Sequence, residues 1–189
     1  MRILIVDNKT LFIKNIKRLL RGHEVEVKKF NEIKVRDANK FDVVILSGGY
    51  EKRVKYHRKR YLKEIRFIRE CKRPVFGICL GFQLICYVFR CKLKRLERPR
   101  RGIVSLKIIK NDPIFKGIKK LKVVERHEWA VKDECGPLEV LAVSKDGIEV
   151  VKHRKRMIYG VQFHPEVKMN SNGYKIVKNF LKMVEKNGK

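Results

Sequence analysis

Acidic residues are scarce in this sequence. Its 189 residues contain 20 Asp and Glu against 48 Lys and Arg, which leaves a formal net charge of +28 at pH 7. A chain with so little negative charge is expected to meet an anionic partner, such as a nucleotide, a nucleic acid or an acidic protein face. The charge balance by itself excludes no fold class.

Long apolar runs are also absent. No stretch approaches the ~20 residues of a membrane-spanning helix, so we expect no membrane contact, and the opening Met1–Asp7 reaches a charge too early for a signal peptide. The five cysteines are an odd number without CxxC spacing, which predicts neither a disulfide framework nor a metal site. A reducing, cytoplasmic setting is therefore expected.

Short β-branched runs alternate with amphipathic segments in the first half of the chain. Predicted strands cover residues 2–6, 24–30, 41–46 and 75–78, with helices at 11–20, 62–71 and 80–89. The second half predicts strands at 103–109, 121–125, 138–143, 147–152 and 157–163, and a last helix at 174–184. This alternation favours βαβ units. We expect a single domain over residues 1–189: a flavodoxin-like three-layer α/β fold with a mostly parallel central sheet and extra strands in the C-terminal half.

One predicted strand runs directly into a Gly-x-Cys-x-Gly turn and then a helix. Gly77 and Gly81 permit a sharp, crowded turn that holds the side chain of Cys79 at the carboxyl end of the strand. The positive end of the following helix favours a thiolate there. A buried structural cysteine explains the same residues, so the motif alone leaves nucleophile and core cysteine equally open.

A second predicted strand ends in Phe163-His164-Pro165-Glu166. Pro165 fixes the chain so that two titratable side chains leave the strand end together, and Glu166 can hold the imidazole of His164 in one tautomer. A surface His beside a Glu usually has no role. Together with Cys79 at another strand end, however, the pair predicts a Cys-His-Glu arrangement.

The turn Ser47-Gly48-Gly49 follows a third buried strand. Adjacent glycines can present backbone N–H groups to an oxyanion, or they can simply form a turn. Because ligands of open α/β sheets collect at the carboxyl ends of the strands, all three motifs are expected at the same functional edge.

In this order, the motifs resemble those of the class I (triad) glutamine amidotransferases, over nearly the whole chain. The resemblance rests on residues 46–49, 77–83 and 160–167. Within the family, residues 112–117, His127 and the closing Lys178-Asn179-Phe180 are similar to the glutaminase subunits of archaeal GMP synthases. Residues 5–8 are similar to the anthranilate synthase glutaminases as well.

The resemblance implies hydrolysis of L-glutamine to glutamate and ammonia. Cys79 would attack the side-chain amide and form a γ-glutamyl thioester, His164 would carry the proton, and Glu166 would hold its ring. Backbone N–H groups of Gly49 and Leu80 would form the oxyanion hole. The residues implied for substrate binding are Gly48, Gln83, His127, Glu128 and Trp129.

The family implies a partner rather than a cofactor. This chain would hold no metal and no cofactor, while ATP and Mg²⁺ would belong to a separate ATP-pyrophosphatase-type synthetase that receives the ammonia. GMP synthase, which converts XMP to GMP, is the first expectation. An anthranilate synthase-like or RNA-modifying synthetase is an alternative, and so is a non-catalytic basic binding or regulatory module on the same fold.

Two further features are the oxyanion loop, which departs from the family pattern, and the basic charge. Tyr50 stands where the family usually has proline, so the oxyanion loop is expected to form when a partner docks. Four basic runs, residues 52–63, 92–101, 116–122 and 153–156, fit a lysine-rich solvated surface, a docking face for an acidic synthetase, or an RNA contact without a recognised motif.

Overall fold

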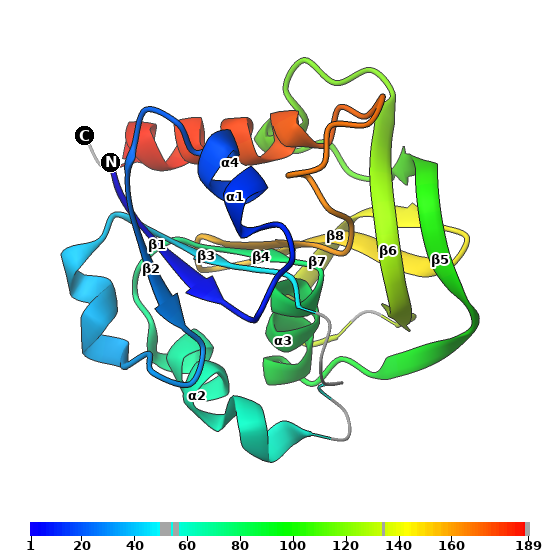
Figure 1. Cartoon of the computed structure of the whole chain (residues 1–189). Helices are drawn as coiled ribbons and strands as arrows, with labels where there is room; N and C mark the ends of the chain where they lie inside the picture. Colours follow the sequence, from blue (N-terminus) through cyan, green and yellow to red (C-terminus); the bar gives the residue numbers. More distant parts are fainter. Residues whose placement is uncertain (50–53, 55–56, 134, 188–189) are drawn as a thin grey trace.

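The structure is a computed structural model, and it describes residues 1–49, 54, 57–133 and 135–187. Tyr50 and much of the basic run after it lie outside these residues. Nine strands of the described chain form one sheet, in the order β2-β1-β3-β4-β9-β8-β6-β5-β7. Helices lie on both faces of this sheet (Figure 1), so the α/β class with three layers is confirmed.

One half of the sheet is parallel. β1 (Arg2–Asp7) lies between β2 (Glu24–Lys29) and β3 (Val43–Leu46), and β4 (Val75–Ile78) joins β3 to β9 (Ile158–Val161). This order is that of a doubly wound sheet, in which ligands bind outside the carboxyl ends of the strands. Those ends carry the three motifs found in the sequence.

The other half of the sheet is antiparallel. It contains β5 (Leu93–Ile108), β6 (Leu121–Val131), β7 (Leu138–Ser144) and β8 (Gly147–His153), and β8 joins β9 in antiparallel pairing. The expectation of a mostly parallel sheet is therefore not confirmed. β5 begins ten residues before the predicted strand because its basic residues, which suggested a solvated run, form the exposed face of a strand paired with β6.

Two helices cover each face of the sheet. α1 (Ile13–Leu19) and α4 (Tyr174–Asn187) lie on one face, and α2 (Leu62–Glu70) and α3 (Leu80–Val88) lie on the other (Figure 1). Short 3₁₀ helices lie at Val35–Lys40, Arg58–Tyr61 and Pro113–Phe115. Within the described ranges, no helix combines the length and apolarity needed to cross a bilayer.

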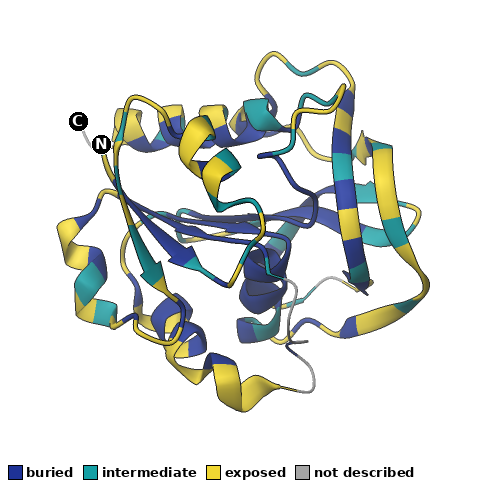
Figure 2. Ribbon diagram, viewed as in Figure 1, coloured by how far each residue is buried: buried dark blue, intermediate teal, exposed yellow. Residues whose placement is uncertain are grey.

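The hydrophobic core lies on both faces of the sheet. Figure 2 shows that the central strands of the sheet are buried. Along β1, Ile3 and Ile5 pack with α1 and α4, while Leu4 and Val6 pack with α2 and α3. Side chains alternate between faces along a strand, so a strand covered on both sides reads as a continuous apolar run. The strands predicted at residues 2–6, 41–46 and 75–78 correspond to β1, β3 and β4.

A disulfide links Cys91 to Cys135, with the two Cα atoms 5.0 Å apart. The two cysteines flank the end of the β5–β6 pairing, where Leu93 lies opposite Val131. The expectation of no disulfide missed this pair because 44 residues separate the cysteines in sequence and only the strand pairing brings them together. Cys71, Cys79 and Cys86 are free and buried.

Helix α3 packs unusually close to the strands beneath its first turn. A Cβ atom placed on Gly81 would lie 2.5 Å from the backbone oxygen of Leu46 and 2.7 Å from its Cβ atom. A Cβ atom on Gly77 would lie 2.7 Å from the backbone carbon of Gly81. Both glycines of the motif are therefore required by packing, as the sequence predicted.

We expect Gly81→Ala to lower the free energy of unfolding by about 3 kcal/mol, because the added methyl group must displace the backbone of β3. Gly22→Ala is the control, because its methyl group would meet nothing within 4 Å. Its only expected loss of stability, about 1 kcal/mol, comes from holding alanine in a left-handed backbone conformation. Urea unfolding measures both values. Equal losses in the two variants would contradict the close approach of α3 to β3.

Candidate active site

Cys79 occupies a strained turn between β4 and α3. Its φ of 48° and ψ of −95° lie where a side chain other than glycine is rarely found, and such strain is concentrated at functional sites. The Cys79 N–H donates to the carbonyl oxygen of Val161 at 2.8 Å, which ties the turn to β9. The side chain is only 5% exposed. This geometry is that of a nucleophile elbow.

His164 and Glu166 follow β9 and are both buried. Nδ1 of His164 lies 2.8 Å from Oε1 of Glu166, so an ionised Glu166 accepts the hydrogen of Nδ1 and leaves Nε2 free to exchange a proton. The ring of Phe12 packs edge-on against the imidazole at 5.4 Å. Gly48 brings the two motifs together, since a Cβ atom there would lie 3.2 Å from Cε1 of His164 and 3.7 Å from Cβ of Cys79.

The electrostatics of this pair favour an imidazolium. Burial acts to lower the pKa of His164, but the negative charge of Cys79 and the carboxylate of Glu166 outweigh burial and hold this pKa well above its ordinary value. A histidine that keeps its proton next to a thiol stabilises the thiolate form of that thiol. The predicted Cys-His-Glu set is therefore brought together in one buried cluster.

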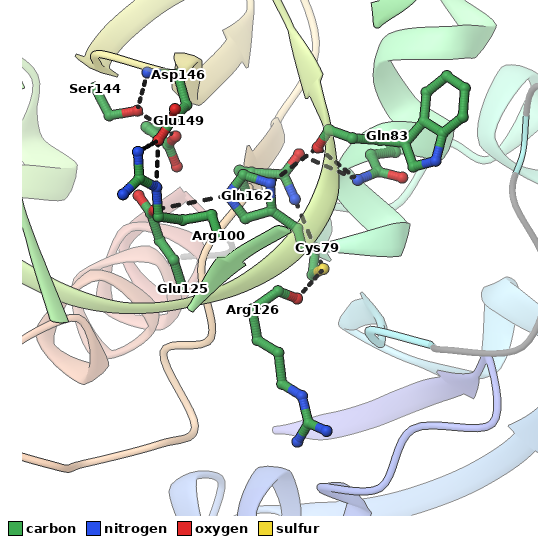
Figure 3. Close-up of polar contacts among 11 residues, drawn as sticks. Cys79, Gln83, Arg100, Glu125, Arg126, Ser144, Asp146, Glu149 and Gln162 are labelled. Carbon is green, nitrogen blue, oxygen red and sulfur yellow. Dashed lines mark hydrogen bonds and ion pairs between the residues drawn. The ribbon is translucent and has the colours of Figure 1, made fainter. Parts of the chain in front are cut away.

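A chain of amide groups lies next to Cys79 (Figure 3). Nε2 of Gln162 donates to Sγ of Cys79 at 3.6 Å, and Nε2 of Gln83 donates to Oε1 of Gln162 at 3.2 Å. Sγ of Cys79 also faces the backbone oxygen of Arg126 at 4.0 Å. Neither Gln162 nor Arg126 was predicted as a site residue. Gln162 lies inside the strand motif before His164, which was a usable signal, whereas nothing in the sequence marks Arg126.

The expected substrate-binding residues separate into two groups. Gln83 and His127 both contact the backbone oxygen of Trp129, Gln83 through Nε2 at 3.3 Å and His127 through Nδ1 at 3.0 Å. These three residues are buried beside the nucleophile. Glu128 instead points outward, with its side chain 43% exposed and 3.9 Å from Arg95.

The expected oxyanion residues are neighbours. Leu80 is the first residue of α3, where backbone N–H groups have no partner within the helix, and a Cβ atom on Gly49 would lie 2.7 Å from Cδ2 of Leu80. A cavity of about 60 Å³ opens here, lined by Thr10, Leu11, Phe12, Gly49, Arg126 and His164. Its volume suits one amide group rather than a whole amino acid.

A buried carboxyl group supports the Ser47-Gly48-Gly49 turn. Nδ2 of Asn8 donates to the backbone oxygen of Ser47 and to Oε1 of Glu64, both at 3.0 Å, and Oγ of Ser47 accepts from the Asn8 N–H at 2.8 Å. Burial raises the pKa of Glu64 to about 8, although the hydrogen bond from Asn8 acts to lower it. At neutral pH this side chain is therefore mostly protonated.

Glu64 should make stability depend on pH. Because its pKa in the folded state, about 8, exceeds its ordinary value of 4.5, the folded protein binds this proton more tightly than the unfolded chain. The contribution of Glu64 to the free energy of unfolding is complete below about pH 4.5 and is lost as the pH rises to about 8. Over this range the free energy of unfolding falls by at most ~1.4 kcal/mol per pH unit. Urea unfolding at several pH values should show this slope in the native protein and a flatter one in Glu64→Gln; equal slopes would contradict the assignment.

Known proteins are similar to this chain in sequence and in structure over almost its whole length. The glutamine-hydrolyzing GMP synthase subunit of Saccharolobus solfataricus is 37% identical over 178 residues, which cover 93% of each chain. Anthranilate synthase component 2 of the same organism is 32% identical over 192 residues, covering 96% of this chain and 98% of that one. A crystal structure from Thermoplasma acidophilum, described as that of a GMP synthase subunit, has a TM-score of 0.89 at 25% identity, over 99% of this chain and 95% of its own.

One family model matches most of the chain. The model described as glutamine amidotransferase class-I matches residues 4–184, a span that includes the elbow at Cys79, the turn at Gly48 and the strand end at His164. The chain belongs to the class I glutamine amidotransferase family.

Proposed function

We propose that this glutamine amidotransferase hydrolyses L-glutamine with Cys79 as nucleophile, His164 as proton carrier and Glu166 as the residue that orients His164, and that residues 1–189 act as one catalytic domain. The observation that carries this assignment is the strained Cys79 elbow placed beside a buried His164–Glu166 pair. A core cysteine would need neither the strain nor the neighbouring ion pair.

The chemistry follows from the charges. The Cys79 thiolate attacks the carbon of the side-chain amide, and the N–H groups of Gly49 and Leu80 stabilise the resulting oxyanion. The imidazolium of His164 gives its proton to the departing nitrogen, so ammonia leaves and a γ-glutamyl thioester remains. His164 then takes a proton from water, the hydroxide attacks the thioester, and glutamate departs as the thiolate re-forms.

The packing behind Cys79 supports a proposal for the substrate-binding residues. Gln83 and Trp129 lie in the network next to the nucleophile, and Gly48 lies against both Cys79 and His164. We propose that these residues, with the backbone of His127 and Glu128, hold the amino-acid end of glutamine. The exposed side chain of Glu128 is not needed for this.

The ammonia acceptor is inferred from the relatives. The glutamine-hydrolyzing GMP synthase subunits of Saccharolobus solfataricus and Pyrococcus abyssi match this chain over more than nine tenths of both lengths, which supports a separate synthetase that carries ATP and Mg²⁺ and converts XMP to GMP in the cytoplasm. The exposed basic residues of β5 support docking to an acidic face of that synthetase; they are Lys94, Arg95, Arg98, Arg101 and Lys107. RNA is the alternative occupant of this face.

We expect ammonia release from glutamine to rise when the ATP-pyrophosphatase subunit, XMP and ATP are added, and to fall to background in Cys79→Ala, because that change removes the nucleophile. Cys86→Ala is the matched control: it removes a buried thiol from α3, the helix that Cys79 precedes, and this thiol plays no part in the proposed steps. Appreciable turnover by Cys79→Ala would overturn the mechanism. Normal hydrolysis without GMP formation would overturn only the choice of acceptor.

Glu166→Gln should change the pH dependence as well as the rate. Loss of the carboxylate removes stabilisation of the imidazolium, so the pKa of His164 falls and the alkaline limb of kcat/KM moves to lower pH. The rate should drop by about 10²- to 10⁴-fold, as for other bases that lose their orienting acid. A pH–rate profile of both proteins measures this; an unmoved alkaline limb would show that Glu166 does not act on His164.

A further inference from the structure

A second buried polar cluster lies beside the catalytic residues. Glu125 and His127 project from β6 and Glu149 from β8, and one ligand-type atom of each lies within 4.8 Å of the others. The two carboxylates are 1% and 0% exposed, and Figure 3 shows them near Arg100 and Asp146. The proposed hydrolysis uses neither carboxylate.

The tautomer of His127 is set by its neighbours. Nδ1 lies 3.0 Å from the backbone oxygen of Trp129, and a carbonyl oxygen can only accept, so Nδ1 carries the hydrogen. In the neutral ring, Nε2 then directs a lone pair towards Oε2 of Glu125, 3.6 Å away. Histidine ligands of metal ions are held in this way, with the other ring nitrogen donating to a backbone carbonyl or carboxylate.

The cluster has acceptors but few donors. Within the described residues, both carboxylate oxygens of Glu125, Oε2 of Glu149 and Nε2 of His127 are buried without a hydrogen-bond partner. Oε1 of Glu149 accepts from Oγ of Ser144 at 2.8 Å, which restrains the carboxylate and leaves Oε2 as its unpartnered oxygen. Buried acceptors without donors are costly and call for an explanation.

The neighbouring side chains supply little positive charge to the cluster. Arg100 lies 3.7 Å from Glu125, but it is also paired with Asp146, so its single charge is shared between two carboxylates. Glu149 lies in the same cluster, and either bound protons or a bound dication would relieve the repulsion between its carboxylate and that of Glu125.

We propose that Glu125, His127 and Glu149 bind a divalent transition-metal ion, with zinc as the best fit. One imidazole nitrogen and two carboxylate oxygens form a donor set that suits Zn²⁺, with Mn²⁺ and Fe²⁺ as weaker fits. The ion would reach the site past the Arg100–Asp146 pair, whose side chains are 25% and 16% exposed.

The ion would link β6 and β8, two strands that share little backbone pairing. β6 and β8 pair in register only at Val131 and Ile148. β6 supplies the backbone oxygens of Arg126 and Trp129 that face Cys79 and Gln83, and the backbone oxygen of Glu149 on β8 accepts from the N–H of Gln162. Metal binding here would therefore fix the strands that hold the amide network behind the nucleophile.

The test is a zinc titration of metal-free protein against a competing chelating dye. It uses the full chain carrying Cys79→Ala, so that a thiol–imidazole pair at the triad cannot bind the ion. We expect one zinc per chain, a Tm that rises with zinc concentration, and at least a 100-fold loss of affinity on adding Glu125→Gln. Adding Glu64→Gln instead, a matched change at another fully buried carboxyl, should leave the affinity unchanged.

Cobalt substitution keeps the test decisive if Glu125→Gln fails to fold. A Co²⁺ spectrum of nitrogen and oxygen ligation, without a thiolate charge-transfer band, supports the site; a thiolate band assigns the ion to Cys71 or Cys86 and overturns it. Folded Cys79→Ala protein that binds neither zinc, cobalt nor manganese also overturns it, and shows that protons neutralise the cluster. None of these readouts depends on glutaminase activity.

Discussion

The structure of the site depends on the backbone conformation of Cys79. A residue with a side chain is held there at a φ of 48° because its surroundings leave no alternative. Its N–H is bonded to Val161 on β9, the N–H of Gly81 is bonded to Ser47 after β3, and the two glycines let α3 press against β3 and β4. One turn thus fixes the relative positions of nucleophile, base and oxyanion turn.

The few acidic residues are unevenly distributed. Among the residues that the structure describes, four glutamates are buried, each close to the polar groups of the site: Glu64, Glu125, Glu149 and Glu166. Each has a different environment, from the hydrogen-bonded Glu64 to the imidazole-paired Glu166. Because these carboxylates lie inside, the outer surface is more basic than the composition alone suggests, and long-range attraction of an anionic partner is correspondingly stronger.

The sequence was informative where burial and chemistry leave a pattern. Continuous apolar runs located β1, β3 and β4, and two short motifs located Cys79, His164 and Glu166 before any geometry was known. It failed where the pattern depends on a partner strand. β5 is exposed along most of its length, so its sequence carries charge instead of alternation, and the Cys91–Cys135 bond exists because β5 meets β6.

The sequence also did not predict in which direction individual side chains point. His127 was expected among the substrate-binding residues, and that expectation did not include the direction of its ring. The ring faces Glu125, because alternation along β6 sends residues 125 and 127 to the same face. Glu149 joins them only through the fold, from a separate strand further along the chain. Such clusters leave no local signal, since each member alone resembles an ordinary polar residue in an alternating strand.

The position of β9 has a consequence for how the chain is made. β9 lies between β4 and β8 and is the strand through which the parallel and antiparallel halves are hydrogen-bonded to each other. During synthesis, everything up to residue 157 emerges from the ribosome before this central strand exists. The growing chain must therefore carry an open, apolar edge on β4, a site for wrong pairing with other chains. The same delay keeps Cys79 of a nascent chain apart from His164, which follows β9 in the sequence.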